Sequence, residues 1–479
     1  MLIQGLAIAH ASVVIVFSIR ILLRDNLSSA ARLAWFMFML FAPYVGVILY
    51  LLFGEISLGR TVHQRHDEIF AKLRAIAAGS LGSCDLYLAD NVETEYQTAF
   101  RAASVDGFGT TLGNTAELLP DAATARSRFI EDIDKATESI QCLYYIWLDD
   151  NTGRNVAEAL VRAACRGVTV HAIADGLGSR KFIRSKHWRN MKSAGIKLAV
   201  ALPMKWVVDT ILFSRLDLRN HRKIAVIDGC ITWCGSQNCA DPEFLVKAKY
   251  APWVDIMLRL RGPVAAQNQL LFASDWMLNS GEEVPDSFEM KADEIEGGFP
   301  AQIFADGPTD RRGATPQLFA TLLTLARKEV VISTPYFVPN TTVLDAICAA
   351  AIRAVDVIMI FPKRNDSWIV AAASHGYYRQ LLEHGVKIYE FRNGLLHSKT
   401  FTIDRRISLI GSTNLDLRSF DLNYENDILL RDDEMTQLIY HRQQEYIAQS
   451  DPVTLEDVNA WAYHRRIWNN VVATIGPIL

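Results

Sequence analysis

The chain has 479 residues, half of them apolar, and a net charge of -4 at pH 7. This length and composition can bury a large core and predict two or three domains. Nucleic-acid-binding proteins normally carry a basic stripe or groove, so the charge balance argues against that class. The odd count of seven cysteines argues against a disulfide framework.

The first sixty residues are more apolar than the rest. Leu33–Phe53 has no charged side chain, and its length suffices to cross a bilayer core of about 30 Å at about 1.5 Å per residue, with Pro43 as a tolerable break. Leu2–Ile19 is also uncharged and predicts a second span. A cleaved signal peptide is the alternative for this earlier segment, but it lacks a basic start. We therefore expect a two-helix transmembrane hairpin.

The charges around this hairpin do not choose its orientation. Three arginines in and beside the connecting loop would keep that loop inside, whereas four cations follow the second span before residue 75. The two signals nearly cancel, so the sequence leaves the side of the membrane open.

An α/β pattern follows, and it occurs twice. Val156, Leu160 and Val161 recur at helical spacing, and the apolar run Val168–Ala174 comes soon after them. This pattern predicts a helix that enters a buried strand. A similar pattern begins 187 residues later, at Val343. The repeat indicates two similar lobes.

An extra apolar segment is expected in the first copy. This copy is about eleven residues longer than the second between its buried strand and the histidine described next, and the surplus is placed within 201–215. Large apolar side chains dominate 203–213. We expect a flap at the membrane surface that admits acyl chains; the alternative is an ordinary buried helix.

Two polar motifs are also duplicated. Each has a histidine, a lysine two residues later and an aspartate five residues after that, and a Gly-Ser-Xaa-Asn sequence begins fourteen residues after each histidine. Chance matches rarely keep both offsets, so the duplication indicates one site built from two halves. The matching pairs are His221 and His397, Lys223 and Lys399, Asp228 and Asp404, Ser236 and Ser412, and Asn238 and Asn414.

The motif spacing suits phosphodiester chemistry. Both runs are rich in β-branched residues and predict strands, on which each histidine and its lysine share a face. Lysine and amide donors can offset the charge that builds on phosphate oxygens during a displacement. Histidine can attack phosphorus, or protonate a leaving alkoxide, near neutral pH. This inventory needs no metal or other cofactor.

The motif His-Xaa-Lys-Xaa4-Asp resembles that of the phospholipase D superfamily, and Gly411–Phe420 resembles the bacterial cardiolipin synthases. The resemblance implies a covalent phosphatidyl-histidine, with one histidine as nucleophile and the other as acid and then base. It favours His221 as the nucleophile and His397 as the acid and base. It also implies acidic residues that orient the histidines, at Glu425 and Asp255, which we group with Asn238, Asn414, Ser236 and Ser412 as substrate-site residues. Relatives commonly carry a basic residue at the position of Asp421. This difference is expected to alter contacts with lipid rather than the chemistry.

The C-terminal segment mixes bases with aromatic residues. It reads Tyr-His-Arg-Arg-Ile-Trp over 463–468. Such a segment could touch lipid headgroups, and a terminal helix that packs on the second lobe is an equally good interpretation.

These patterns predict an α/β fold with two pseudo-symmetric phospholipase D-like lobes, whose mixed sheets are flanked by helices, after an N-terminal two-helix transmembrane hairpin. The predicted parts are the hairpin at 1–60, a juxtamembrane linker at 61–115, the first lobe at 116–285 and the second lobe at 286–479.

The resemblance implies a cardiolipin synthase, a multi-pass enzyme of the bacterial inner membrane. It would transfer a phosphatidyl group from one phosphatidylglycerol to another and release glycerol. A phospholipase D, or another phosphatidyltransferase with a different acceptor, is the nearer alternative. An inactive membrane scaffold is disfavoured by two intact motifs, and a nuclease by the apolar spans and the lack of a basic stripe.

Overall fold

The computed structural model describes residues 2–24, 27, 29–54, 60–80, 94–104, 107–203, 217–283, 291 and 293–474. The chain forms two compact units, a small N-terminal one that ends before Arg60 and a large one that begins there. The expected flap falls almost wholly in 204–216, outside the described residues.

The N-terminal unit is helical, but the predicted second span is not one helix. Its helices are α1 (Leu2–Leu22), α2 (Ser29–Phe41), α3 (Pro43–Leu49) and the π-helix η1 (Tyr50–Gly54). The break lies at Ala42, whose φ of -142° and ψ of 60° are not helical, because the proline at the next position disfavours a helical residue before it. Within the described part of the chain, no helix has both the length and the apolar character needed to cross a membrane.

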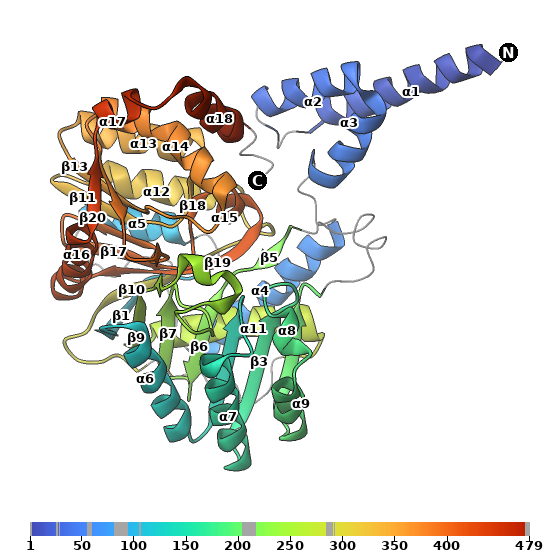
Figure 1. The fold of residues 1–479 in the computed structure, drawn as a ribbon. Coiled ribbons are helices and arrows are strands. Elements are labelled where there is room, and N and C mark those ends of the chain that lie inside the picture. Colours follow the sequence, from blue (N-terminus) through green and yellow to red (C-terminus); the bar gives the residue numbers. More distant parts are fainter. Residues whose placement is uncertain are drawn as a thin grey trace. The chain divides into compact units, whose positions relative to one another are not determined.

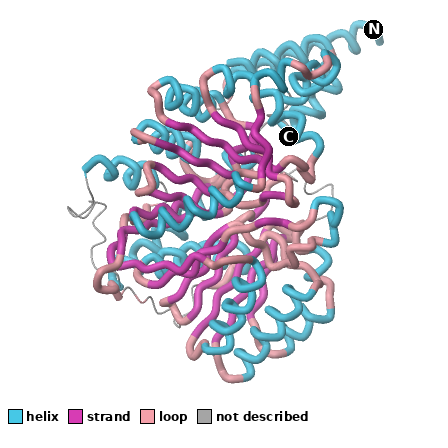
Figure 2. Tube along the Cα trace, turned by 60° about the vertical axis from the view of Figure 1, so that its left-hand side comes forward, coloured by secondary structure: helices cyan, strands magenta, loops and turns pink. Residues whose placement is uncertain are grey.

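The large unit is built on one continuous mixed sheet (Figures 1 and 2). From its outer edge inward, the first lobe contributes β4 (Lys197–Ala201), β3 (Thr169–Asp175), β2 (Ser139–Tyr144), β6 (Lys223–Ile227), β7 (Ile231–Gly235), β9 (Met257–Arg261) and β1 (Thr111–Leu118). From the centre outward, the second lobe contributes β10 (Phe299–Asp306), β19 (Asn423–Arg431), β17 (Ile407–Gly411), β16 (Thr400–Ile403), β11 (Glu329–Ser333), β13 (Asp356–Pro362), β14 (Lys387–Phe391) and β20 (Ser450–Val453).

The strand order has an internal pseudo-twofold symmetry. At the centre, β1 and β10 run antiparallel, with Thr111 opposite Ala301 and Asn114 opposite Phe299. Moving outward, β1 is followed by β9, β7, β6, β2, β3 and β4, and β10 is followed by β19, β17, β16, β11, β13 and β14. Each strand of the first series has its counterpart at the same place in the second. The two predicted lobes are therefore present, and they share a single sheet.

Helices cover both lobes (Figure 1). Those of the first lobe are α6 (Ala122–Lys135), α7 (Asn151–Cys165), α8 (Arg180–Ile183), α9 (Lys186–Ser193) and α11 (Val264–Ser280). Those of the second lobe are α12 (Ala314–Leu325), α13 (Thr341–Ile352), α14 (Trp368–Glu383), α15 (Leu417–Asp421), α16 (Asp433–Ala448), α17 (Leu455–Asn459) and α18 (Tyr463–Thr474).

The region predicted as a juxtamembrane linker contains two helices that pack on the lobes. They are α4 (Arg60–Ser80) and α5 (Thr94–Ala103). Helix α4 packs against α11 in the first lobe, whereas α5 packs against α12 in the second. The C-terminal helix α18 packs against α14, as one of the two interpretations of that segment expects.

Local signals explain the repeated helix and strand. Asp150 caps α7 by accepting a hydrogen bond from the backbone N–H of Gly153, and Gly167 ends the helix region with a φ of 94° that favours glycine. The strands β3 and β6 lie inside the sheet with both faces covered, which explains their nearly continuous apolar runs. Lys223 follows the end of β4 by 22 residues, whereas Lys399 follows the end of β14 by eight. The surplus in the first lobe therefore lies after β4.

Candidate active site

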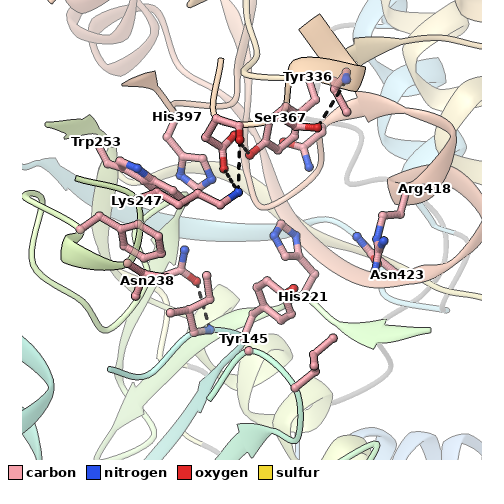
Figure 3. A pocket seen from close by; sticks show the side chains of 18 of the residues that line it. Tyr145, His221, Asn238, Lys247, Trp253, Tyr336, Ser367, His397, Arg418 and Asn423 are labelled. Atoms are coloured by element: carbon pink, nitrogen blue, oxygen red, sulfur yellow. Dashed lines mark hydrogen bonds and ion pairs between the residues drawn. The ribbon is translucent and has the colours of Figure 1, made fainter. Parts of the chain in front are cut away.

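One cavity of about 530 Å³ opens between the two lobes (Figure 3). His221 and Asn238 line it from the first lobe, and His397 and Asn414 line it from the second. The two halves of the duplicated motif thus meet at one cavity, as the repeat predicts.

Each histidine is held by backbone of the opposite lobe. The first, His221, follows the short strand β5 (Arg219–Asn220), and its N–H donates to the carbonyl of Tyr424 at 2.9 Å. The second, His397, follows β15 (Leu395–Leu396), and its N–H donates to the carbonyl of Val254, in β8 (Trp253–Val254), at 2.8 Å. Because each contact crosses between the lobes, the site depends on how the lobes pair.

The carboxylates cross between the lobes in the same way. Glu425 of the second lobe lies 2.7 Å from Nδ1 of His221, and Asp255 of the first lobe lies 2.6 Å from Nδ1 of His397. A carboxylate on Nδ1 favours the tautomer with its proton there, which leaves Nε2 as the atom available for reaction. Asp255 and Glu425 therefore contact the histidines and do not line the cavity.

The motif serines support these carboxylates. Ser236 donates to Asp255 at 2.6 Å, and Ser412 donates to Glu425 at 2.5 Å. Neither serine lines the cavity. We expected both serines in the substrate site, but the structure places them behind the carboxylates, where they fix the orientation of the imidazoles.

The two lysines are buried beside the histidines, and neither lines the cavity. Nζ of Lys223 donates to the carbonyl of His221 at 2.6 Å, and Nζ of Lys399 donates to that of His397 at 2.7 Å. Burial lowers the pKa of Lys223 to about 8. Burial, together with repulsion from Lys223, lowers the pKa of Lys399 to about 7. Two buried ammonium groups that repel each other favour the entry of an anion.

The surroundings lower the pKa of both imidazoles. Burial and the neighbouring Lys399 lower the pKa of His397 to about 4, although Asp255 opposes the shift. Burial and the two lysines hold the pKa of His221 well below its usual value. Burial works against ionisation of Asp255, yet the adjacent His397 keeps the pKa of this carboxyl below its usual range. A neutral Nε2 can act as a nucleophile.

Asp228 and Asp404 do not reach the histidines, although we predicted them as catalytic residues. The carboxylate of Asp228 accepts hydrogen bonds from the backbone N–H groups of Thr137, Glu138 and Ser139, at 2.9, 2.8 and 3.0 Å. The carboxylate of Asp404 accepts hydrogen bonds in the same way from the backbone N–H groups of Arg327, Lys328 and Glu329, at 2.9, 2.7 and 2.9 Å. Each aspartate follows the end of its strand that points away from the histidine, and these strands, β6 and β16, are roughly 13 to 16 Å long at about 3.3 Å per residue. Each carboxylate therefore hydrogen-bonds to the backbone where the neighbouring strand, β2 or β11, begins.

Two aromatic residues of the site were missed by sequence reasoning. The ring of Tyr145 lies 4.8 Å from that of His221 in an edge-to-face arrangement, and the ring of Trp253 lies 4.5 Å from that of His397. Trp253 lies in β8, in the segment between the motif asparagine and the orienting carboxylate. That segment has 16 residues between Asn238 and Asp255 in the first lobe and 10 between Asn414 and Glu425 in the second, so comparison of the two copies could not align it.

A polar contact across the cavity was also missed. Lys247 lies on the 3-10 helix η2 (Leu245–Tyr250) of the first lobe, and its Nζ lies 2.6 Å from the carboxylate of Asp366 in the second. The hydroxyl of Tyr336 donates to the same carboxylate at 2.7 Å. All three residues line the cavity, and Figure 3 labels Lys247 and Tyr336. Only the tertiary structure brings these distant residues together.

Among the described residues, no three His, Cys, Asp or Glu side chains are grouped closely enough to share a metal ion. Cys230, Cys234 and Cys239, which lie near the first motif, are free thiols. Burial raises the pKa of Cys239 well above its usual value. Cys234 and Cys239 therefore belong to the core around the site, whereas Cys230 is only partly buried.

The chain resembles known proteins over almost its whole length. Residues 129–276 and 319–446 match the family model described as cardiolipin synthase, PLD-like domain, and residues 12–55 match the one described as phospholipase D-nuclease N-terminal. Cardiolipin synthase A of Yersinia pseudotuberculosis serotype O:1b (strain IP 31758) is 36% identical over 463 residues, which cover 95% of this chain and 93% of the relative. The same figures hold for cardiolipin synthase A of Yersinia pestis.

A solved structure shares the fold. The phosphatidylserine synthase of Haemophilus influenzae Rd KW20 aligns with a TM-score of 0.60 at 15% identity, over 81% of this chain and 100% of that one. At this identity the likeness concerns the fold alone, and it agrees with the paired-lobe architecture.

Proposed function

Because the chain belongs to the cardiolipin synthase family of phospholipase D-like phosphatidyltransferases, we propose that its paired histidines transfer a phosphatidyl group from one phosphatidylglycerol to another. The products are cardiolipin and glycerol. The observation that carries this proposal is the crossed arrangement at one cavity, in which each imidazole is paired with a carboxylate of the opposite lobe.

Substrate binding uses the two motif lysines and the side-chain amides of the two motif asparagines. The phosphodiester of the donor lipid enters the cavity near Lys223 and Lys399, whose ammonium groups offset its charge. Asn238 and Asn414 line the cavity and add neutral donors. The bound anion raises the pKa of both lysines and of His397, so the histidine takes up a proton that Asp255 stabilises.

The first displacement forms a phosphohistidine. Nε2 of His221 attacks phosphorus, and the bond between phosphorus and the headgroup glycerol oxygen breaks. The proton on Nε2 of His397 passes to that oxygen, and glycerol leaves. We assign the acid and base role to His397 because its partner, Asp255, has a lowered pKa and remains charged.

The second displacement releases the product. The headgroup hydroxyl of a second phosphatidylglycerol gives its proton to His397 and attacks the phosphohistidine, which frees His221 and forms cardiolipin. If water takes the place of this hydroxyl, the product is phosphatidic acid and the enzyme acts as a phospholipase D. Apolar lining residues such as Leu148, Phe244 and Val338 favour a lipid acceptor by displacing water.

Product analysis tests this proposal. The wild-type chain, in mixed micelles with labelled phosphatidylglycerol as the only phospholipid, is compared with His221→Ala and His397→Ala by lipid chromatography. Wild type should form cardiolipin and free glycerol, and each variant should lose at least about 10³-fold in kcat. Quenching in detergent at neutral to mildly alkaline pH, where the acid-labile P–N bond persists, should trap a labelled phosphoenzyme on His221, which His397→Ala can still form with an activated leaving group. Phosphatidic acid as the main product would favour the phospholipase alternative, and a kcat within about tenfold of wild type in either variant would contradict the shared site.

We also propose that the N-terminal unit anchors the enzyme in the membrane as a helical hairpin. Exposed apolar side chains on α1 and α2, among them Ile15, Val16, Leu33 and Phe41, support this interpretation. The full chain should resist extraction from bacterial inner membranes by alkaline carbonate, whereas a chain that begins at Arg60 should be released. Release of the full chain would contradict an anchor that crosses the bilayer.

A further inference from the structure

One face beside the cavity is strongly basic, although the chain as a whole is slightly acidic. Six lysines and arginines occur from residue 180 to 192, with no acidic residue among them. All six are exposed on or beside α8 and α9, and none forms an ion pair with another described residue. The six are Arg180, Lys181, Arg184, Lys186, Arg189 and Lys192.

This basic face continues into the cavity. Arg180 and Lys181 line the cavity itself, together with the exposed Leu177 that precedes α8. Surface cations of a soluble protein are usually interspersed with acids. A single-sign cluster at the opening of a cavity therefore indicates an anionic partner that the opening faces.

Another part of the rim of the same cavity is apolar and exposed. In the first lobe, Leu245 and Val246 of η2 are 77% and 57% exposed, and Val246 lines the cavity. In the second lobe, Trp368 is 63% exposed and directly precedes two lining residues, Ile369 and Val370. Large apolar side chains from both lobes thus surround the opening.

Helix α18 extends this apolar rim. Its Val472 is buried against α14, whereas Tyr463, Ile467 and Val471, spaced four residues apart, form an exposed stripe on another face. The ring of Trp468 stacks on that of Trp368 at 5.8 Å between centroids, which joins the stripe to the rim. The helix therefore has a second apolar face beyond the one that packs on the second lobe.

We propose that this rim, which we call the mouth surface, docks on an anionic lipid bilayer. It consists of residues 180–192, Leu245, Val246, Trp368 and the exposed stripe of α18. The cations contact anionic headgroups while the tryptophans and aliphatic side chains enter the interfacial layer. A second protein copy would match the apolar part, but the unpaired cations and a cavity that opens at their edge favour a lipid surface. The proposal rests on the proposed function, because a lipid substrate can then enter the cavity without leaving the bilayer.

Photo-crosslinking tests the docking independently of turnover. The full chain is placed in nanodiscs that contain radiolabelled phosphatidylglycerol, with p-benzoylphenylalanine in place of Trp468. The matched control carries the same crosslinker in place of Leu438, an apolar residue of α16 that is 45% exposed, against 47% for Trp468. We expect labelled lipid on the first variant at no less than tenfold the level of the second. Equal labelling, or protein–protein crosslinks in place of lipid, would overturn the proposal.

Charge reversal provides a kinetic test. The variant Arg184→Glu/Lys186→Glu/Arg189→Glu is compared with Lys135→Glu/Arg327→Glu/Lys328→Glu, which reverses three exposed cations at the far ends of β2 and β11. At low salt, the first variant should lose at least tenfold in rate on phosphatidylglycerol vesicles and less than twofold on a monomeric short-chain phosphatidylglycerol. The control should lose less than twofold on both.

The two substrates separate the possible failures. Equal losses on vesicles and on monomeric lipid would overturn the docking proposal, because the cations would then act on the chemistry or the fold. If wild type forms no cardiolipin from either substrate but the crosslink at position 468 persists, the proposed function fails while the docking surface stands.

Discussion

Asp255 of the first lobe hydrogen-bonds Nδ1 of His397 in the second lobe at 2.6 Å. Glu425 and His221 repeat the relationship in the opposite direction, at 2.7 Å. Neither lobe alone contains a histidine with its orienting carboxylate. The proposed catalysis therefore requires both lobes, although each carries a complete copy of the motif.

Neutral amides in place of these carboxylates should slow the chemistry and leave the fold intact. Asp255→Asn and Glu425→Gln keep the side-chain shape but remove the charge that supports the imidazole, so we expect kcat to fall by about 10²–10⁴-fold. Ser236→Ala, which only loosens Asp255, should cost about tenfold. Steady-state assays with matched circular dichroism spectra test this, and a kcat within threefold of wild type would remove the carboxylates from the mechanism.

The distant aspartates should affect stability more than chemistry. Asp228→Ala leaves three backbone N–H groups without their acceptor and should cost about 2–4 kcal/mol in the free energy of unfolding. Asp404→Ala should behave alike. Thermal unfolding in detergent and kcat per folded molecule are the two measurements. A full-length, stably folded Asp228→Ala protein with abolished turnover would show that the aspartate acts on the site after all.

The lysines should produce a basic limb in the pH profile of kcat/KM. The pKa of Lys399 is about 7 and that of Lys223 about 8 in the free site. Only the protonated form attracts the phosphodiester, so kcat/KM should fall as the pH rises through this range. Lys399→Arg keeps its charge at all these pH values, and its profile should lose the lower of the two transitions. An unchanged profile would assign the limb to another group.

The contact between Lys247 and Asp366 should influence the competition between lipid and water. Because it joins the lobes across the cavity, its loss should admit water and raise the ratio of phosphatidic acid to cardiolipin several-fold. Lys247→Met and Asp366→Asn test this by lipid chromatography. Lys249→Met is the control, since this lysine is exposed on the same helix and lies over Tyr250. An equal ratio in all three variants would contradict a role for the contact.

Much of the architecture could be predicted because it depends on local spacing. The helix around Val156 and the strand after Gly167 form α7 and β3 as the periodicity indicates. The equal offsets of His221 and His397 predicted one composite site, and both histidines line one cavity. The predicted second span is not a single helix, because Pro43 disfavours a helical conformation at Ala42 although the segment is apolar throughout.

The sequence by itself determined the two copies and the inventory of histidines, lysines and asparagines, because these follow from residue type and from repeated spacing. The strands predicted to carry the histidines begin after them, since β6 starts at Lys223 and β16 at Thr400. Only the tertiary structure decided that Glu425 contacts His221 and that Asp255 contacts His397. It also decided that Asp228 and Asp404 hydrogen-bond to backbone N–H groups away from the histidines. The physical reason is that the antiparallel pairing of β1 with β10 joins the lobes across nearly two hundred residues. No local pattern encodes which side chains meet across that joint.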